Sequence, residues 1–239
     1  MAYKAVFKRY ELKYMLTHRQ KDQLLQVMAP YMKLDEYGHT TIRNIYFDTD
    51  NYRIIRNSLE KPAYKEKLRM RSYDRAAKDS TVFVELKKKY RSVVYKRRVS
   101  MPEHQAMHWL CGGREHPPET QIVREIDYFR SFYQTLHPAM FLSYEREAFY
   151  SLAGDDFRVT FDENILGREE DLSLESEIWG TSLLENGMVL MELKTPGGIP
   201  LWMTHFLTAQ QIFKTSFSKY GTAYQNKTIN PMHGGLLYA

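Results

Sequence analysis

Charged residues in this sequence recur at alternate positions of short stretches that otherwise have the composition of β-strands. In the segment Lys65–Arg71, every second residue is basic. Three further stretches carry a glutamate two residues before a lysine, at Glu11/Lys13, Glu85/Lys87 and Glu192/Lys194. Because side chains on a strand alternate between its two faces, residues two apart share a face. One face of several strands is therefore expected to carry charge, most of it positive.

These charged faces have two interpretations. Taken strand by strand, the simpler one is a solvent-exposed face. Solvated faces, however, usually mix Lys, Glu, Thr, Ser and Gln, whereas these contain several arginines. Their opposite faces are apolar, as with Val84 and Leu86 between the charged positions of 82–87. If helices cover the apolar face, the charged face lines a barrel interior, and like charges buried there need a bound anion.

A chain of phosphates suits this set of residues best. An arginine guanidinium binds two phosphate oxygens at once, and a lysine supplies a point charge. A carboxylate holds Mg²⁺ or Mn²⁺, which in turn bridges phosphate oxygens. Glutamates placed among basic stripes therefore predict a site for a polyanion together with a divalent metal.

The elements that must position these residues are predicted to be mainly strands. Strand-like runs rich in Val, Ile, Tyr, Phe or Thr cover 7–15, 40–47, 64–73, 81–89, 93–101, 139–150, 157–164 and 188–195. Helices are expected after a capping box at Thr17 and Gln20, and over 102–110, 122–136 and 200–213. Gly38 is expected in a turn, and Asp48 at a strand end that caps a short helix. The order favours an α+β fold in which an antiparallel β-barrel forms a tunnel with helices packed outside.

The composition predicts one domain over residues 1–239, with its core at about 7–224. The 43% of hydrophobic residues excludes global disorder, and the lone Cys111 excludes an intramolecular disulfide. No apolar run approaches the roughly 18 residues of a membrane span, so we expect a cytoplasmic protein that does not span a membrane, with a membrane partner left open. The formal net charge is only +5. We therefore expect the basic excess to face inward and the remaining surface to be neutral or acidic.

Eight segments resemble, in order and spacing, the VTC domain, which is the polyphosphate polymerase domain of the vacuolar transporter chaperone family. This family lies within the triphosphate tunnel metalloenzyme, or CYTH-like, superfamily. The matching segments are 10–13, 46–50, 68–73, 82–87, 144–149, 158–162, 191–194 and 217–220. The resemblance implies a tunnel that binds a nucleoside triphosphate or polyphosphate with a divalent metal, Mn²⁺ or Mg²⁺.

The stripes and the resemblance together assign roles to individual residues. Residues expected to act at the reacting phosphates are Arg69, Arg71, Lys87, Arg146, Arg158 and Glu192. Residues expected to bind substrate are Lys13, Lys96, Arg98, Lys194, Ser218 and Lys219. Glu192 is the implied metal ligand, with Glu11 and Glu85 as further candidates. One departure is Ser216, where the eukaryotic polymerases of the family have a lysine; Lys214 lies close in sequence.

Three functions are compatible with such a tunnel. The leading hypothesis is transfer of the γ-phosphoryl group of ATP to a growing polyphosphate, in which the acceptor phosphate attacks and no nucleophilic side chain is needed. A second hypothesis is a triphosphatase in which Glu11 or Glu85 orients water or a second metal. The third is a non-catalytic sensor of polyphosphate or nucleotide. No nucleic-acid partner is expected, because the many tyrosines accompany neither a ribonucleoprotein motif nor a basic helix. The oligomeric state is left open.

Overall fold

The structure is a computed structural model that describes residues 10–91, 93–113 and 117–229. The first residues of the predicted strand 7–15 lie outside these ranges. The strands of the described part are β1 (Tyr10–Thr17), β2 (Met32–Asp48), β3 (Tyr64–Tyr73), β4 (Thr81–Tyr90), β5 (Val93–Pro102), β6 (His137–Ser151), β7 (Arg158–Arg168), β8 (Thr181–Ser182), β9 (Met188–Thr195) and β10 (Lys214–Thr215). The helices are α1 (His18–Met28), α2 (Arg53–Leu59), α3 (Glu103–Leu110), α4 (Gln121–Tyr133), α5 (Leu201–Ala209) and α6 (Lys219–Ile229).

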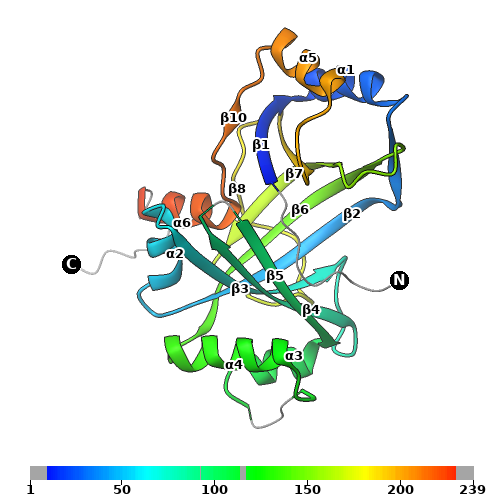
Figure 1. Cartoon of the computed structure of the whole chain (residues 1–239). Coiled ribbons are helices and arrows are strands. Elements are labelled where there is room, and N and C mark those ends of the chain that lie inside the picture. The colour runs from blue at the N-terminus through cyan, green and yellow to red at the C-terminus, as the bar shows by residue number, and fades with distance from the viewer. Residues whose placement is uncertain (1–9, 92, 114–116, 230–239) are drawn as a thin grey trace, which may run out of the picture.

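All strands belong to one antiparallel sheet, which curls strongly on itself (Figure 1). The strand order is β10-β1-β9-β7-β6-β2-β3-β4-β5, and β8 pairs with β7. The predicted antiparallel tunnel fold is therefore confirmed, with one difference. Within the described ranges no backbone ladder joins β5 to β1, so the sheet leaves one side open instead of closing into a complete barrel.

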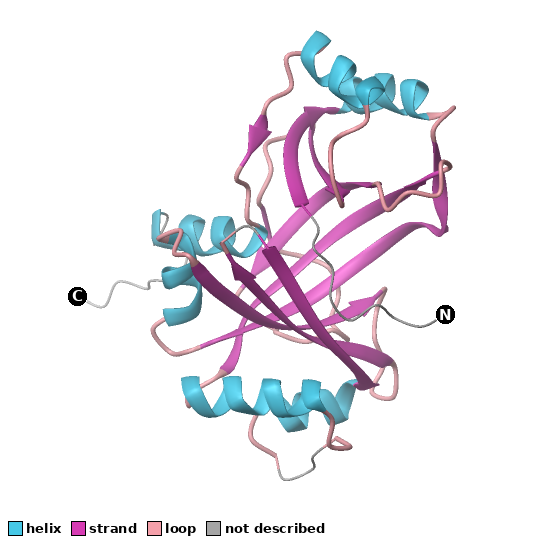
Figure 2. Ribbon diagram, viewed as in Figure 1, coloured by secondary structure: helices cyan, strands magenta, loops and turns pink. Residues whose placement is uncertain are grey.

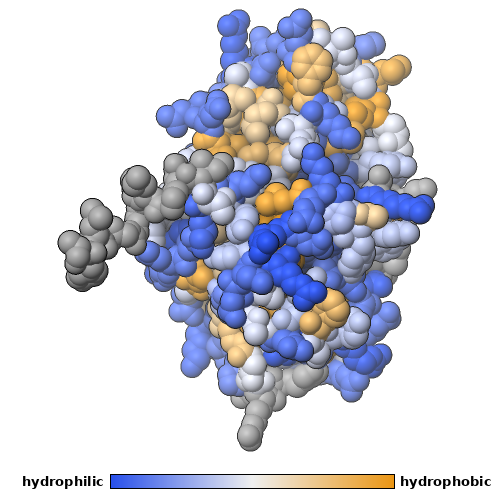
Figure 3. All heavy atoms as spheres, turned by 90° about the vertical axis from the view of Figure 1, so that its left-hand side faces the viewer, coloured by the Kyte–Doolittle hydropathy of each residue, from blue (hydrophilic) through white to orange (hydrophobic). Residues whose placement is uncertain are grey.

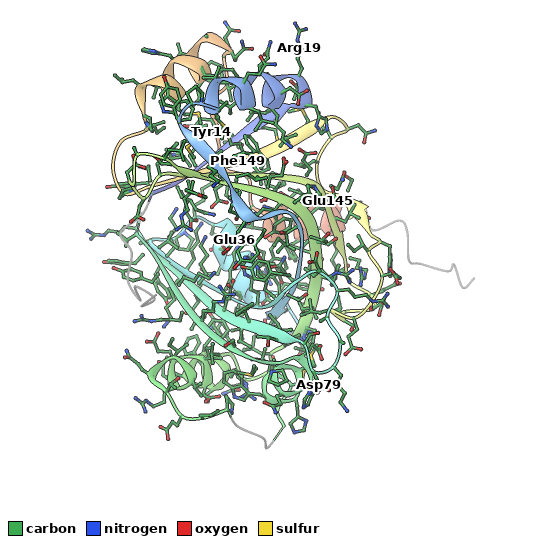
Figure 4. All side chains as sticks on the ribbon, turned by 90° about the vertical axis from the view of Figure 1, so that its right-hand side faces the viewer. Tyr14, Arg19, Glu36, Asp79, Glu145 and Phe149 are labelled. Carbon is green, nitrogen blue, oxygen red and sulfur yellow. The ribbon has the colours of Figure 1, made fainter. Side chains whose placement is uncertain are left out.

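The helices form three groups around the curled sheet (Figure 2), and two of them cover its outer side. The third group contains α6, which packs against the opposite face of the sheet around Tyr46, Leu142 and Tyr220. α1 and α5 pack over β1, β7 and β9 around Leu16, Phe161 and Met191. α3 and α4 pack over β2, β3 and β4 around Leu68 and Val84. α2 and α6 lie together at one side. In Figure 4, Tyr14 and Phe149 lie below α1 on this outer side, and Arg19 projects from α1 away from the sheet.

Capping residues fix the N-terminal ends of α1 and α2, whereas two C-terminal helix ends differ from the prediction. The capping box forms as predicted: the Gln20 amide donates to Thr17 Oγ1 at 3.2 Å, and the Thr17 amide donates to Gln20 Oε1 at 2.9 Å. Asp48 caps α2 as predicted, because Oδ1 accepts from the Ile54 amide and Oδ2 from the Ile55 amide. The predictions for 122–136 and 200–213 ran too far, since α4 ends at Tyr133 and α5 at Ala209.

Two features differ from the sequence-based expectation. Gly38, with φ of +58°, lies inside β2 instead of ending it, at a shift of register between Leu34 and His39. A bulge of this kind bends a strand without breaking it, so β2 extends to Met32. α6 was not predicted, because its early Gly221 is a poor helix former. A Cβ atom at this position would lie 3.0 Å from Leu59 Cδ2, so the glycine permits the close packing of α6 on α2. No helix in the described ranges is both long and apolar enough to cross a membrane.

Candidate functional site

The register of the strands places the predicted charge stripes on one surface, the face of the sheet opposite α1, α3, α4 and α5, which we call the inner face. Arg69 lies opposite Glu85 on β4 and Tyr46 on β2, and Arg146 lies opposite Asp162 on β7. The basic side chains of the inner face are Lys13, Lys65, Lys67, Arg69, Arg71, Lys87, Lys89, Lys96, Arg98, Arg146, Arg158, Lys194 and, from the start of α6, Lys219. The acidic ones are Glu11, Glu85, Asp162 and Glu192.

The inner face therefore holds 13 Lys and Arg residues but only 4 Asp and Glu residues. The other residues within the described ranges comprise 17 basic against 24 acidic ones, in agreement with the expected inward excess. Figure 3 shows strongly hydrophilic side chains gathered across the middle of one side of the molecule, with apolar ones more frequent toward one end.

Two walls make up the inner face. The β3–β5 wall comprises Lys65, Lys67, Arg69, Arg71, Glu85, Lys87, Lys89, Lys96 and Arg98. The β1–β9 wall comprises Glu11, Lys13, Arg146, Arg158, Asp162, Glu192, Lys194 and Lys219. The first wall has eight cations and one carboxylate, and the second has five cations and three carboxylates.

Glu85 organises the β3–β5 wall. Its side chain is only 1% exposed, and its Oε2 atom accepts from Arg69 Nε at 2.8 Å and lies 2.6 Å from Arg69 Nη2. Its Oε1 atom lies 2.5 Å from Lys96 Nζ and 3.8 Å from Arg98 Nε, and its Oε2 atom lies 4.0 Å from Arg71 Nε. Burial alone would raise the pKa of the Glu85 carboxyl, but Arg69, Arg71 and Lys96 hold it well below its usual range.

These contacts favour another role for Glu85 than holding metal or orienting water. In this structure each of its oxygens lies within hydrogen-bond distance of a cationic nitrogen, of Arg69 or of Lys96. Its place in the structure is that of a counter-ion, which keeps Arg69, Arg71, Lys96 and Arg98 together on the wall.

A ladder of lysines continues along β3 and β4. Lys67 lies opposite Lys87, and Lys65 lies opposite Lys89. Side chains in such cross-strand positions are close, and like charges there repel. Among the described residues, no carboxylate forms an ion pair with Lys65, Lys67 or Lys89. The ladder therefore carries an excess of positive charge, since only Lys87, which pairs with Glu11, has a carboxylate partner among the described residues.

Lys67 is a site residue that the sequence-based assignment left out, although it belongs to the basic stripe. Its ammonium donates to Ser218 Oγ at 3.1 Å and lies 5.9 Å from the centre of the Tyr220 ring. Burial lowers the pKa of Lys67 to about 8, and the neighbouring ammonium groups of Lys13 and Lys87 add to this effect.

Asp162 is the second residue that the assignment left out, and it anchors the β1–β9 wall. Its side chain is fully buried. Its Oδ1 atom accepts from Arg146 Nε at 2.6 Å, and its Oδ2 atom accepts from Arg146 Nη2 at 2.7 Å and from Lys219 Nζ at 2.5 Å. Strand parity alone places it on the inner face with Arg158, but its partner Lys219 lies 57 residues away in sequence.

Glu192 and Glu11 lie on adjacent strands of the same wall. Glu11 Oε2 accepts from Lys87 Nζ at 2.6 Å, which connects β1 to β4 across the open side of the sheet. Glu192 lies 3.6 Å from Lys194 Nζ, and no other described side chain approaches its carboxylate within hydrogen-bond distance. Burial alone would raise the pKa of the Glu192 carboxyl, but Lys194, Lys13 and Lys87 hold it well below its usual range. Glu192 is thus an ionised carboxylate whose oxygens accept no hydrogen bond from the described side chains.

This arrangement fits a divalent cation that binds together with phosphate. Mg²⁺ in proteins is commonly held by one or two carboxylates plus phosphate oxygens and water. In the described ranges no three His, Cys, Asp or Glu side chains gather at one point, so these residues supply no complete metal cage. Glu192, with Glu11 beside it, has the donor atoms for such a shared site.

The segment before α6 closes against both walls. Lys13 Nζ donates to the Phe217 carbonyl at 2.8 Å, Lys67 to Ser218 Oγ, and Lys219 to Asp162. The structure thereby brings the predicted Ser218 and Lys219 to the inner face. Lys214 lies opposite Tyr14 and so shares the outer face of β1, which means that it does not replace the lysine absent at Ser216.

The inner face also contains two tyrosines that bind its arginines, and one arginine that is exposed to solvent. The hydroxyl of Tyr46 accepts from Arg69 Nη1 at 3.0 Å, and that of Tyr144 accepts from Arg71 Nη2 at 2.9 Å. Burial alone would raise the pKa of Tyr144, but Arg71, Arg146 and Lys219 outweigh it and lower this pKa to about 8. Arg158 occupies the inner-face register at the end of β7, opposite Lys194, and is exposed to solvent.

A cavity of about 340 Å³ lies elsewhere, beside α3 and α4, lined among others by Cys111, Asp127 and Arg130. It contains none of the residues of the two walls.

The family profile described as VTC domain matches residues 8–227. The chain belongs to the VTC domain family. No curated protein matches its sequence. Among solved structures, a candidate adenylate cyclase from Bacillus halodurans superimposes with a TM-score of 0.55 at 14% identity, covering 90% of this chain and 96% of that one. A candidate adenylyl cyclase from Hippeastrum, described as having a dominant triphosphatase activity, gives 0.54 at 12%, covering 91% and 96%. At such identities the two neighbours establish the shared fold.

Proposed function

We propose that this VTC domain transfers the γ-phosphoryl group of ATP to the end of a polyphosphate chain held along its inner face. The observation that carries the proposal is the charge of that face, where thirteen cations accompany four carboxylates. A polyanion that neutralises such an excess is expected to bind favourably, because the repulsion among the cations is relieved. The ladder of Lys65, Lys67, Lys87 and Lys89, in which Lys87 alone has a carboxylate partner among the described residues, extends past the Glu85 cluster. This extension favours a ligand longer than a single triphosphate.

Both walls would contribute cations that bind the phosphates. Arg69 and Arg71 present guanidinium groups that are already oriented by Glu85 and by the tyrosine hydroxyls. From the β1–β9 wall, Arg146, Lys194 and Lys219 face the same space. Phosphoryl transfer is promoted mainly by alignment and by neutralising charge on the non-bridging oxygens. The inner face has the residues for both.

The reaction needs no nucleophilic side chain. A terminal oxygen of the acceptor polyphosphate forms a bond to the γ-phosphorus of ATP, the bond from that phosphorus to the β–γ bridging oxygen breaks, and ADP leaves with the electron pair. Arg146 and Lys219 would bind the transferred phosphoryl oxygens. Glu192, supported by Glu11, would hold a divalent cation, Mn²⁺ or Mg²⁺, which when bound neutralises charge on the phosphates.

A triphosphatase is the second candidate, and the activity described for the Hippeastrum neighbour favours it. Water reaches the inner face, because the side chains of Lys87 and Lys96 are about 40% exposed. With water as acceptor, the same residues would release phosphate from ATP or tripolyphosphate. A non-catalytic sensor would use the same cations with no turnover.

The deciding experiment incubates the purified protein with ATP and Mn²⁺ and sizes the products on a gel stained for polyphosphate. Polymerase activity gives ADP and a ladder of long chains. Phosphate release without polymer identifies a triphosphatase, and tight, salt-sensitive binding of polyphosphate without loss of ATP identifies a sensor; either result overturns the polymerase proposal.

A further inference from the structure

Asp162 joins two cations that come from distant parts of the chain. Arg146 lies on β6 and Lys219 is the first residue of α6. Arg146 Nη2 and Lys219 Nζ donate to the same Oδ2 atom, at 2.7 and 2.5 Å. The two nitrogens are therefore separated by at most the sum of these distances, which is close enough for both to contact one phosphoryl group.

The contacts with Asp162 leave donors unused on both cations. A guanidinium has five N–H groups and an ammonium has three, whereas Asp162 accepts two from Arg146 and one from Lys219. Both cations also lie over the ring of Tyr144, at 5.1 Å for Arg146 and 4.3 Å for Lys219. The carboxylate and the ring thus set the orientation in which the remaining N–H groups meet a ligand.

The same carboxylate holds the start of α6 against the sheet. Lys13 and Lys67 bind neutral acceptors on Phe217 and Ser218, whereas the bond between Lys219 and Asp162 is an ion pair. Without Asp162, the positive charges of Arg146 and Lys219 repel each other in a partly buried setting, where such repulsion is weakly screened. Both side chains then lose their shared orientation.

We propose that Asp162 is a positioning residue, which holds Arg146 and Lys219 side by side so that their free N–H groups bind the same phosphoryl group. Because both of its oxygens are occupied, it acts through these cations and ligates no metal. The inference rests on the phosphate chemistry proposed above, and it assigns to β7 a function other than holding metal.

An Asp162→Asn variant separates positioning from binding. It removes a negative charge next to the substrate, so attraction for a polyanion increases, while the ion pairs that orient Arg146 and Lys219 are lost. We expect kcat to fall by about tenfold to a hundredfold, in line with the cost of misplacing reacting groups, and KM for ATP to stay equal or decrease. Lys219→Gln, which removes a cation, is expected to lower kcat and to raise KM.

Glu163→Gln is the matched control. Glu163 is the next residue on β7, faces the opposite side of the sheet and pairs with Lys21 of α1. The substitution removes the same charge from the same strand and is expected to leave kcat and KM near those of the unchanged protein. Thermal unfolding of each variant reports whether it folds. If Asp162→Asn does not fold, Asp162→Glu keeps the charge and is expected to retain KM with an intermediate kcat.

Two results would overturn the inference: Asp162→Asn raising KM as Lys219→Gln does, or Asp162→Asn matching Glu163→Gln in both constants. Calorimetric binding of tripolyphosphate without added metal distinguishes this failure from a failure of the proposed function. If the unchanged protein shows no turnover, the proposed function fails, but Asp162→Asn must still bind tripolyphosphate more tightly than Glu163→Gln does. Equal or weaker binding would then contradict the placement of Asp162 beside the phosphate site.

Discussion

The two walls of the inner face use opposite charge arrangements. On the β3–β5 wall one carboxylate, Glu85, lies near four cations. In the lysine ladder beyond it, Lys65, Lys67 and Lys89 have no counter-ion among the described residues, and Lys87 pairs with Glu11 of the other wall. On the β1–β9 wall three carboxylates accompany five cations, and Glu192 keeps free oxygens. A wall with a large cation excess supplies affinity for a polyanion. A wall of mixed charge can hold a metal ion and orient its cations through carboxylates, as the reacting end of the phosphate chain requires.

The largest effect is expected from Glu192→Gln on the β1–β9 wall. Loss of the carboxylate with free oxygens removes the ligand for a divalent cation, whose charge stabilisation is worth several kcal/mol, so metal-dependent turnover of ATP should fall about a thousandfold. Binding of tripolyphosphate without metal should stay equal or tighten, because a negative charge is lost. Steady-state kinetics and calorimetry test the two parts. Retained turnover would show that the metal is held elsewhere.

On the β3–β5 wall, Glu85→Gln is expected to lower the free energy of unfolding of the protein. Four cations would lose their buried counter-ion, and breaking a buried pair in this way costs about 3 kcal/mol of unfolding free energy. Tripolyphosphate binds the folded state and should restore much of that loss. Urea denaturation with and without tripolyphosphate measures both quantities. A variant as stable as the unchanged protein in the absence of ligand would contradict the counter-ion role.

The affinity for phosphate should depend on pH near 8 through Lys67. Its pKa is lowered to about 8, so the side chain is charged at pH 7 and neutral at pH 9. Bound phosphate favours the charged form; affinity for tripolyphosphate is therefore expected to weaken as the pH rises through 8.

Tyr144 titrates in the same range and gains negative charge as the pH rises, so its effect has the same sign. Binding isotherms from pH 7 to 9.5 for Lys67→Met and Tyr144→Phe separate the two contributions. If Lys67→Met keeps the full pH dependence, Lys67 does not contact the ligand.

The smallest effect is expected at the far end of the lysine ladder. A double variant, Lys65→Met with Lys89→Met, should bind polyphosphate of many units several-fold more weakly but bind tripolyphosphate unchanged. Lys88→Met is the matched control, because Lys88 faces the outer side of β4 and pairs with Glu125. Competition binding with chains of defined length measures the difference. An equal loss for short and long chains would place the ladder at the triphosphate site itself.

The inner face itself was predictable from sequence, because alternation along a strand needs no tertiary information. The stripe at 65–71 and the pairs at Glu11, Glu85 and Glu192 lie on one surface as expected. The roles of individual residues on this face were harder to predict from the sequence. Glu85 shares its glutamate–lysine spacing with Glu192, and only the approach of Arg69 and Lys96 from neighbouring strands makes it a counter-ion.

Contacts between distant segments explain most of what the sequence did not reveal. The role of Asp162 depends on Lys219, and Lys67 stands out only because Ser218 and Tyr220 bury it. The open side of the sheet depends on how far the sheet curls. No local pattern in β5 states whether it pairs with β1, and a salt bridge between Lys87 and Glu11 spans that side instead.

A crystal structure of the protein with tripolyphosphate and Mn²⁺ tests the central claim most directly. The account predicts a phosphate chain along the inner face, contacted by Arg69 and Arg71 from one wall and by Arg146 and Lys219 from the other, with the metal at Glu192. Tripolyphosphate bound only on the outer surface, or an inner face in which Glu85 and Asp162 keep all of these cations from the ligand, would contradict it.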